Sequence, residues 1–270
     1  MATVLKSRVA VDELKQQLCE LANAQFDSLQ FRRLLGLRMN KARAAVYMVQ
    51  RTLWTLNRRE AWAGAQASAP LDVKKLIWEH EREELEGEPE RGMPDHFTLG
   101  VNEGESVGLT RQDFEKTPPC DGLLACSYAW RYIALHSPWL KAVTAAACLE
   151  TSNSDEIVNG GGMAHRMAHK FRDEAGITFQ QQVSNVEHMA ADVRHANLLF
   201  EVIDRHVATE ADRALVLEGA RESWALDRVW KGQLAEVIAA VSEWETRKRQ
   251  ELLCSTMALF RYARVEASPL

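Results

Sequence analysis

The feature that most constrains the fold of this chain is a long stretch without proline, between Pro138 and Pro269. Proline inside a helix removes a hydrogen bond and clashes with the preceding turn, so a chain without it can form long uninterrupted helices. Nowhere do apolar and polar residues alternate in runs bounded by hairpin turn signals, the pattern expected of half-buried strands. The sequence therefore predicts an all-α fold.

Several helix ends can be placed from residues that favour them. Asn40 suits the N-cap of a segment whose apolar residues keep helical spacing up to Gly64. A second such segment, residues 67–87, follows a proline-containing turn and ends at a glycine. Two further helix starts are marked by capping pairs, Thr110 with Asp113 and Thr209 with Asp212.

These segments predict one bundle of about seven or eight helices. The chain has 270 residues, which is enough to bury a sizeable core, and no repeat or low-complexity linker divides it. We therefore expect a single domain over residues 1–270.

The composition excludes several classes of protein. With 46% hydrophobic and 26% charged residues, the chain has the composition of a soluble globular protein, and its net charge of −5 argues against a nucleic-acid partner. The basic runs at residues 31–43 and 245–250 are interpreted as solvated helix faces. The five cysteines include no C-x-x-C pair, and neither a secretory leader nor a membrane-spanning segment is recognisable. We expect a cytoplasmic protein without a membrane partner.

The segment that says most about function is "VEHMAADVRHANLL", residues 186–199. At 3.6 residues per turn, steps of four and seven residues return to nearly the same side of a helix, so His188, Asp192 and His195 share one stripe. Two imidazoles and a carboxylate on one stripe could bind a metal, form a buried hydrogen-bonded network, or lie in water. The spacing alone leaves these alternatives open.

Other segments supply further candidate ligands. In "WEHEREE", residues 78–84, His80 and Glu84 share a helix face at i, i+4, and His96 follows the next loop. Glu150 lies among alanines, where a buried carboxylate is costly unless a metal, a proton or a partner charge compensates it.

Helix bundles build metal sites from Glu and His side chains that project inward from several helices. Carboxylate and imidazole without thiolate suit iron or manganese open to dioxygen better than structural zinc. Charge patterning alone would make the acidic helix a solvated face. A further pair, His165 and His169, is predicted to lie on the surface because lysine and arginine surround it.

In the order of these segments, the chain resembles the haem-oxygenase-like di-metal oxidases, a superfamily that also holds the TenA-type thiaminases and pyrroloquinoline quinone synthase. Residues 77–97, "IWEHEREELEGEPERGMPDHF", are similar to the family's Glu-bearing helix, glycine-containing loop and following histidine. Residues 186–195 match its H-x-x-x-D-x-x-H helix position for position. The resemblance extends over roughly residues 30–240.

The resemblance implies a haem-oxygenase-like helical fold with a metal centre. Carried over residue by residue, it implies six metal ligands: Glu84, His96, Glu150, His188, Asp192 and His195. Glu150 matches an extra carboxylate that some members supply from the preceding helix. Two irons per chain are then expected, one of them weakly held.

The chain departs from the family in an early helix. Members usually supply another Glu there, whereas residues 28–59 contain no Asp or Glu, and Gln50 and Arg51 stand at the expected place. Glu81 or Glu150 would then complete the second metal position. Arg51 would bind a substrate carboxylate, which a guanidinium matches in geometry, or form a salt bridge to the acidic helix.

The activity implied by the resemblance is that of a non-haem di-iron oxidase that uses dioxygen on a small amino-acid-derived metabolite. The reaction would be N-oxygenation, oxidative decarboxylation or C–C cleavage in a biosynthetic pathway. Four aromatic residues that could line a substrate pocket have the helical spacing of core residues, so they do not identify the substrate. These residues are Tyr47, Trp54, Trp130 and Tyr132.

Two alternatives stay open. One is a metal-free oxidase of the same fold, in which His188 and His195 act as acid–base groups. The other is a helical interaction protein without enzymatic activity. For the enzyme we expect a small-molecule partner and leave a homodimer open.

Overall fold

The computed structural model describes residues 8–241, and these residues form helices, turns and one isolated β-bridge. The all-α prediction is confirmed, but the described part contains eleven α-helices rather than seven or eight. The helices are α1 (Arg8–Phe26), α2 (Leu29–Gly36), α3 (Lys41–Ser68), α4 (Leu71–Glu86), α5 (His96–Glu105), α6 (Arg111–Lys116), α7 (Asp121–His136), α8 (Trp139–Thr151), α9 (Met163–Ala175), α10 (Val183–His206) and α11 (Glu210–Ala240). Single 3-10 turns cover Pro89–Arg91 and Phe179–Gln181. The count was too low because α2 and α6 have eight and six residues, too few to show a helical period.

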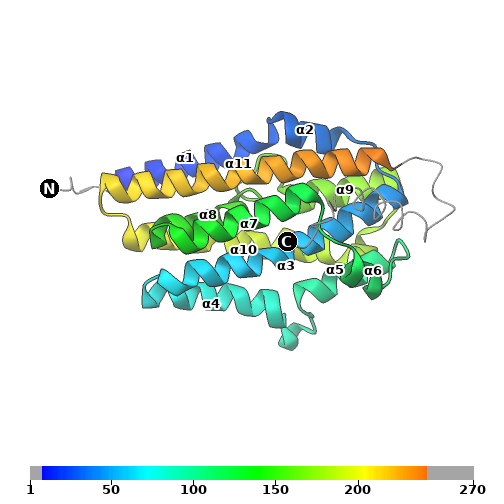
Figure 1. Ribbon diagram of the computed structural model, residues 1–270, viewed down its shortest axis with the longest axis horizontal. Helices are drawn as coiled ribbons and strands as arrows, with labels where there is room; N and C mark the ends of the chain where they lie inside the picture. The colour runs from blue at the N-terminus through cyan, green and yellow to red at the C-terminus, as the bar shows by residue number, and fades with distance from the viewer. Residues whose placement is uncertain (1–7, 242–270) are drawn as a thin grey trace, which may run out of the picture.

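The long helices α3, α7, α8, α10 and α11 run side by side along the longest axis of the molecule (Figure 1). Helices α1 and α2 pack on α11 at one edge, and α4 packs on α3 at the opposite edge. Buried apolar side chains from all these layers form one core, in which Trp62, Trp224 and Trp230 are the largest fully buried side chains. Among the described residues, no helix is both long and apolar enough to span a bilayer.

The helix caps read from the sequence are confirmed. The Asn40 side chain accepts a hydrogen bond from the backbone of Arg43, and Gly87 ends α4 with a positive φ of 75°. Capping boxes are present at Thr110 with Asp113 and at Thr209 with Asp212. A Cβ at Gly87 would clash with the backbone of Met93 and Pro94, so only glycine fits this tight turn.

Gly64 does not end a helix, contrary to the sequence prediction, because α3 continues to Ser68. A Cβ at Gly64 would lie 3.1 Å from Cβ of Ala134 on α7. The glycine therefore allows α3 and α7 to approach each other closely. Cys120, Cys126 and Cys148 are buried free thiols and Cys19 is half-buried, whereas Cys254 and the basic run 245–250 lie outside the described residues.

We predict that Gly100→Ala destabilises the protein by about 1–3 kcal/mol, the usual cost of overpacking. Gly100 lies on α5 against buried Thr52 of α3, and an added Cβ would lie 2.8 Å from Thr52 Cγ2. Urea unfolding measures the change. Gly36→Ala is the matched control, since an added Cβ there meets nothing within 4 Å and alanine favours a helix. Equal stability of Gly100→Ala and wild type would contradict the close α3–α5 contact.

Candidate metal centre

Four helices bring the candidate ligands into one buried cluster. Helix α4 carries two of them, α5 and α8 carry one each, and α10 carries three. Their ligand atoms form three groups, within each of which all atoms lie within 4.8 Å of one another. The groups are His80–Glu84–His195, Glu84–His96–His188 and Glu150–Asp192–His195.

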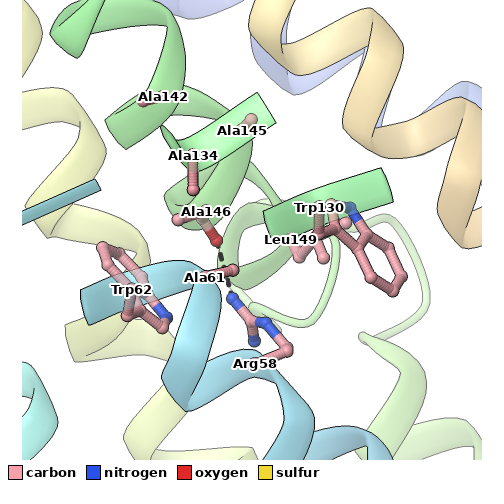
Figure 2. A pocket seen from close by; sticks show the side chains of 9 residues that line it. All are labelled: Arg58, Ala61, Trp62, Trp130, Ala134, Ala142, Ala145, Ala146 and Leu149. Carbon is pink, nitrogen blue, oxygen red and sulfur yellow. Dashed lines mark hydrogen bonds between the residues drawn. The ribbon is translucent and has the colours of Figure 1, made fainter. Parts of the chain in front are cut away.

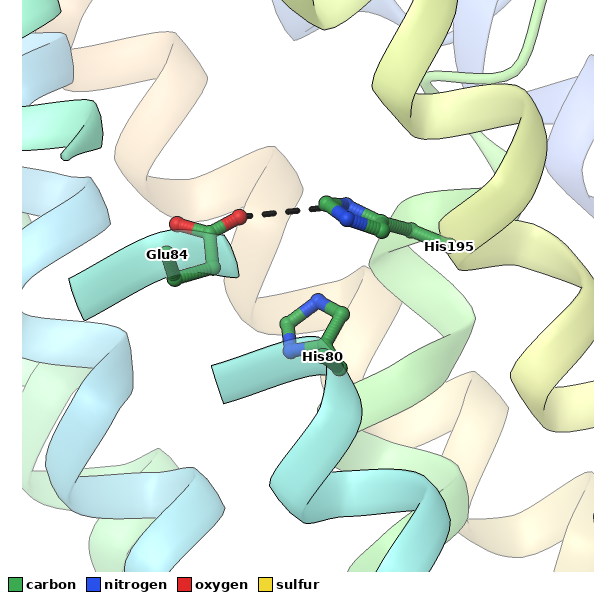
Figure 3. A group of neighbouring side chains, drawn as sticks. All are labelled: His80, Glu84 and His195. Carbon is green, nitrogen blue, oxygen red and sulfur yellow. Dashed lines mark ion pairs between the residues drawn. The ribbon is translucent and has the colours of Figure 1, made fainter. Parts of the chain in front are cut away.

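Glu84 lies at the centre of this cluster and belongs to two of the groups. Figure 3 shows that His80 and Glu84 project from α4 toward His195 on α10. Glu84 Oε1 lies 3.8 Å from His195 Nδ1, and Glu84 Oε2 lies 3.1 Å from His96 Nδ1. One carboxylate therefore faces histidines on both sides.

Three of the four histidines are held from outside the cluster. His80 Nδ1 lies 3.1 Å from the Glu81 carboxylate, and His195 Nε2 lies 3.0 Å from the Glu83 carboxylate. His188 Nδ1 lies 2.7 Å from the backbone oxygen of Ser184. Such contacts fix the ring and leave the other nitrogen as a lone-pair donor, which is the usual arrangement around metal-binding histidines.

The inward atoms of the cluster lack hydrogen bonds. Five buried side-chain atoms in it have no hydrogen-bond partner: His80 Nε2, Glu84 Oε2, His96 Nδ1, Asp192 Oδ2 and His195 Nδ1. Two of these atoms, Glu84 Oε2 and His96 Nδ1, lie 3.1 Å apart, and Arg59 Nη1 lies 3.2 Å from Glu84 Oε2. Leaving a buried polar atom without a hydrogen bond costs about 1–3 kcal/mol, so five in one place favour a shared cationic partner. All five can donate a lone pair, and a metal cation would satisfy them together. The residues present therefore fit a metal centre.

The protonation of the cluster reflects burial and crowding. Burial raises the pKa of Glu84, but Arg59 and His96 outweigh it and hold this pKa well below its usual range. Burial, with repulsion from Glu150 and Glu84, holds the pKa of Asp192 well above its usual range. Burial, aided by Arg51, keeps the pKa of His188 well below its usual range, so this imidazole is neutral.

Two arginines of α3 neutralise the carboxylates on one side of the cluster. Arg58 Nη1 lies 2.7 Å from Glu150 Oε1, and Arg59 Nη1 lies 2.7 Å from Glu81 Oε1 and 3.2 Å from Glu84 Oε2. Arg58 also donates to the backbone oxygen of Ala146 beside a small, alanine-lined apolar pocket between α3, α7 and α8 (Figure 2). Burial raises the pKa of Glu150, but Arg58 outweighs it and lowers this pKa. The early helix, from which the resemblance implied a carboxylate ligand, thus supplies guanidinium groups to the cluster.

All six residues predicted as ligands lie in the cluster, and they are buried. His80 was a candidate from its i, i+4 spacing to Glu84, but the six-ligand set implied by the resemblance left it out. Glu81 lies outside the three groups and contacts His80 and Arg59 instead.

Other predictions have mixed outcomes. The suggested salt bridge from Arg51 to the acidic helix is wrong, since Arg59 forms it and Arg51 makes no ion pair among the described residues. His165 and His169 are only partly buried, and the candidate metal groups of the described part do not include them. Tyr132 is 67% exposed and is not a core residue, whereas the other three aromatic residues are buried.

Residues 45–228, more than half of the chain, match the model of a family described as iron-containing redox enzymes, and the chain belongs to this family. No match was found among curated proteins.

Two solved structures are similar to the fold. One is a domain of unknown function with a haem oxygenase-like fold from Shewanella denitrificans OS217, with 14% identity and a TM-score of 0.66 over 98% of this chain and 100% of that one. The other is a CADD-like protein of unknown function from Nostoc punctiforme PCC 73102, with 17% identity and a TM-score of 0.62 over 87% of this chain and 100% of that one. The haem-oxygenase-like fold is confirmed.

We predict that Glu83→Gln flattens the pH dependence of stability in the metal-free protein. The contact with His195 lowers the pKa of Glu83 from its usual 4.5 to about 2. A depressed pKa contributes stability that is present above pH 4.5 and is lost as the pH falls toward 2. Wild type should therefore exceed Glu83→Gln in unfolding free energy above pH 4.5, and the difference should shrink toward pH 2.

Urea unfolding at several pH values measures this difference. Glu79→Gln is the matched control, because Glu79 is exposed on the same helix and should leave the pH profile of wild type unchanged. Parallel profiles of wild type and Glu83→Gln would show that Glu83 does not hold His195.

Proposed function

We propose that this protein is a non-haem iron oxidase that uses dioxygen to oxidise a small amino-acid-derived metabolite. The observation that supports the proposal is the cluster of seven buried His, Asp and Glu side chains with five unpartnered ligand atoms. Membership of an iron-containing redox family supports iron as the metal. Imidazole and carboxylate donors without thiolate also suit iron.

The three groups divide into two proposed metal positions. Glu84, His96 and His188 would hold one ion. Glu150, Asp192 and His195 would hold the other, with His80 beside them. Glu84 also neighbours His80 and His195, so it would lie beside both positions. When bound, ferrous ions supply the electrons that activate dioxygen.

The remaining residues would prepare the site. Glu81, Glu83 and the Ser184 backbone hold three histidines in fixed orientations. Since all seven ligand side chains are at most 7% exposed, the packed helices exclude bulk water from them. Arg58 and Arg59 offset part of the negative charge. The protein would thus orient the ligands, exclude water from the site and offset part of its charge.

Unequal occupancy of the two positions is part of the proposal. Glu150 is engaged by Arg58, so a metal bound beside Asp192 must compete with a guanidinium for this carboxylate. In the other position Glu84 also faces a guanidinium, that of Arg59, but at the longer distance of 3.2 Å against 2.7 Å for Arg58 and Glu150. We therefore infer that the position containing His96 and His188 binds the stronger-held ion. In this proposal His188 of the α10 stripe would contribute to one position, and Asp192 and His195 to the other.

Titration of ferrous iron into anaerobic metal-free protein tests the proposal. We expect up to two irons per chain with two affinities. His188→Ala should remove the stronger, and Asp192→Ala should remove the weaker, while circular dichroism stays helical. His165→Ala is the control outside the cluster and should bind as wild type does. A chain that never binds iron above background under these conditions would refute the oxidase.

The same samples separate the two alternatives. Oxygen consumption that requires iron and is lost in His188→Ala favours the oxidase over a metal-free enzyme, which would keep its activity in the presence of a chelator. A non-enzymatic interaction protein would bind no iron and consume no oxygen.

Arg58→Met should destabilise the metal-free protein by about 3–5 kcal/mol, because it leaves the buried Glu150 carboxylate without its guanidinium. Ferrous iron or zinc should restore much of this loss, since a metal replaces the missing positive charge. Thermal unfolding with and without metal measures both effects. Arg33→Met, which removes an exposed ion pair with Glu236, is the control and should change little. A metal effect no larger in Arg58→Met than in wild type would contradict a metal at Glu150.

A further inference from the structure

One buried face of α3 extends beyond the metal cluster. It carries five buried side chains at intervals of three or four residues: Tyr47, Arg51, Trp54, Arg58 and Trp62. The last two contact the cluster, because Arg58 pairs with Glu150 and the Trp62 ring lies 4.6 Å from the His80 ring. The middle of this face contacts α10 and α11 instead, through the Arg51–Ser184 hydrogen bond and the stacked rings of Trp54 and Trp230.

Two buried cations lie along this face, Arg51 on α3 and Lys231 on the neighbouring helix α11, and neither has a carboxylate within hydrogen-bond distance in the described part of the chain. Lys231 of α11 is 5% exposed and forms no hydrogen bond with any described residue. Its nearest carboxylate oxygen, on Asp227, lies 3.8 Å away and already accepts a hydrogen bond from Trp230 Nε1. Arg51 is 8% exposed, and among the described residues its side chain makes one hydrogen bond, to the neutral hydroxyl of Ser184. Buried charges are normally paired, so this arrangement is costly as it stands.

Hydrogen-bond donors predominate around the rings of Trp54 and Trp230. The Lys231 ammonium lies 5.1 Å from the centre of the Trp54 ring and 4.4 Å from that of Trp230. Trp54 Nε1 is itself buried without a partner. Arg51 and Arg58 lie close enough to lower the pKa of Lys231, after the larger effect of burial. Ammonium, guanidinium and indole can donate hydrogen bonds but cannot accept them, so the missing partner is an acceptor with negative charge.

We propose that Arg51 and Lys231 form a binding subsite for the carboxylate of the substrate. Guanidinium and ammonium both bind carboxylate, and the apolar rings around them suit a small organic acid better than a strongly hydrated inorganic anion. Ser184 locates the subsite, because its hydroxyl contacts Arg51 while its backbone oxygen contacts His188. An acid anchored here would direct its other end toward the metal cluster.

This subsite rests on the proposed oxidase for its role in a reaction, but its binding can be measured without metal. The probe is butyrate, with its neutral counterpart butyramide, added to metal-free protein at constant ionic strength. Calorimetry should show saturable binding of butyrate, and butyrate should raise the Tm, whereas butyramide should do neither. Equal binding of both compounds, or tighter binding of phosphate than of butyrate, would overturn the assignment.

Variants identify the residues involved. Lys231→Met and Arg51→Gln should each weaken butyrate binding at least tenfold, and Lys231→Arg should remain within a few-fold of wild type. Lys141→Met is the matched control, because Lys141 is paired with Glu218 and Glu222 near the surface. Unchanged butyrate binding in Lys231→Met would overturn the subsite.

Stability separates this role from a purely structural one. Without butyrate, Lys231→Met should change the Tm little, since the ammonium that it removes lies 3.8 Å from Asp227, too far for a hydrogen bond, and burial already raises the pKa of this carboxyl group. A lower Tm together with wild-type butyrate binding would show that Lys231 only supports the fold. Failure of the oxidase would appear in the iron titration and leave butyrate binding intact, so the two failures are distinguishable.

Discussion

The burial of many ionisable side chains in one helical core is the constraint on which the rest of this structure depends. Carboxylates and imidazoles from α4, α5, α8 and α10 meet where water is excluded, and each charge must find an opposite charge nearby. Helix α3 supplies two of the positive charges, because Arg58 pairs with Glu150 and Arg59 pairs with Glu84. The five atoms without hydrogen-bond partners are all lone-pair donors, which is the kind of atom that a metal cation binds.

Helix α3 connects this centre to the proposed carboxylate subsite. Its buried face carries aromatic residues and arginines in turn, so the same helix sets the distance between Arg51 and Arg58 at two turns. A small molecule bound at Arg51 would therefore reach the metal cluster near Arg58. Chains with 14% and 17% identity share this fold, because apolar packing tolerates many sequences, but the charges on such a face must be established for each protein.

What could be read from the sequence follows from the range of the interactions involved. The stripe of His188, Asp192 and His195 depends only on helical spacing, so its common direction was predictable, as were the caps at Asn40 and Gly87. Pairings between distant segments were not, and Arg58 with Glu150 and Glu83 with His195 could not be inferred from local spacing. The helix count was too low for another reason, since a helix of about two turns, such as α2, is too short to show a period.

The connection between α4 and α5 closes on itself. Glu88 and Met93 exchange two backbone hydrogen bonds, after the sharp turn at Gly87. Glu84 and His96 therefore meet through the closure of a loop, whereas the α10 residues are aligned by the pitch of one helix. A related protein could gain or lose residues between Glu84 and His96 as long as the loop still closed. Insertion of even one residue within the α10 triplet would rotate a ligand away by about 100°. A sequence pattern used to find such chains should therefore allow a variable number of residues between Glu84 and His96. The spacing of His188, Asp192 and His195 should be kept fixed.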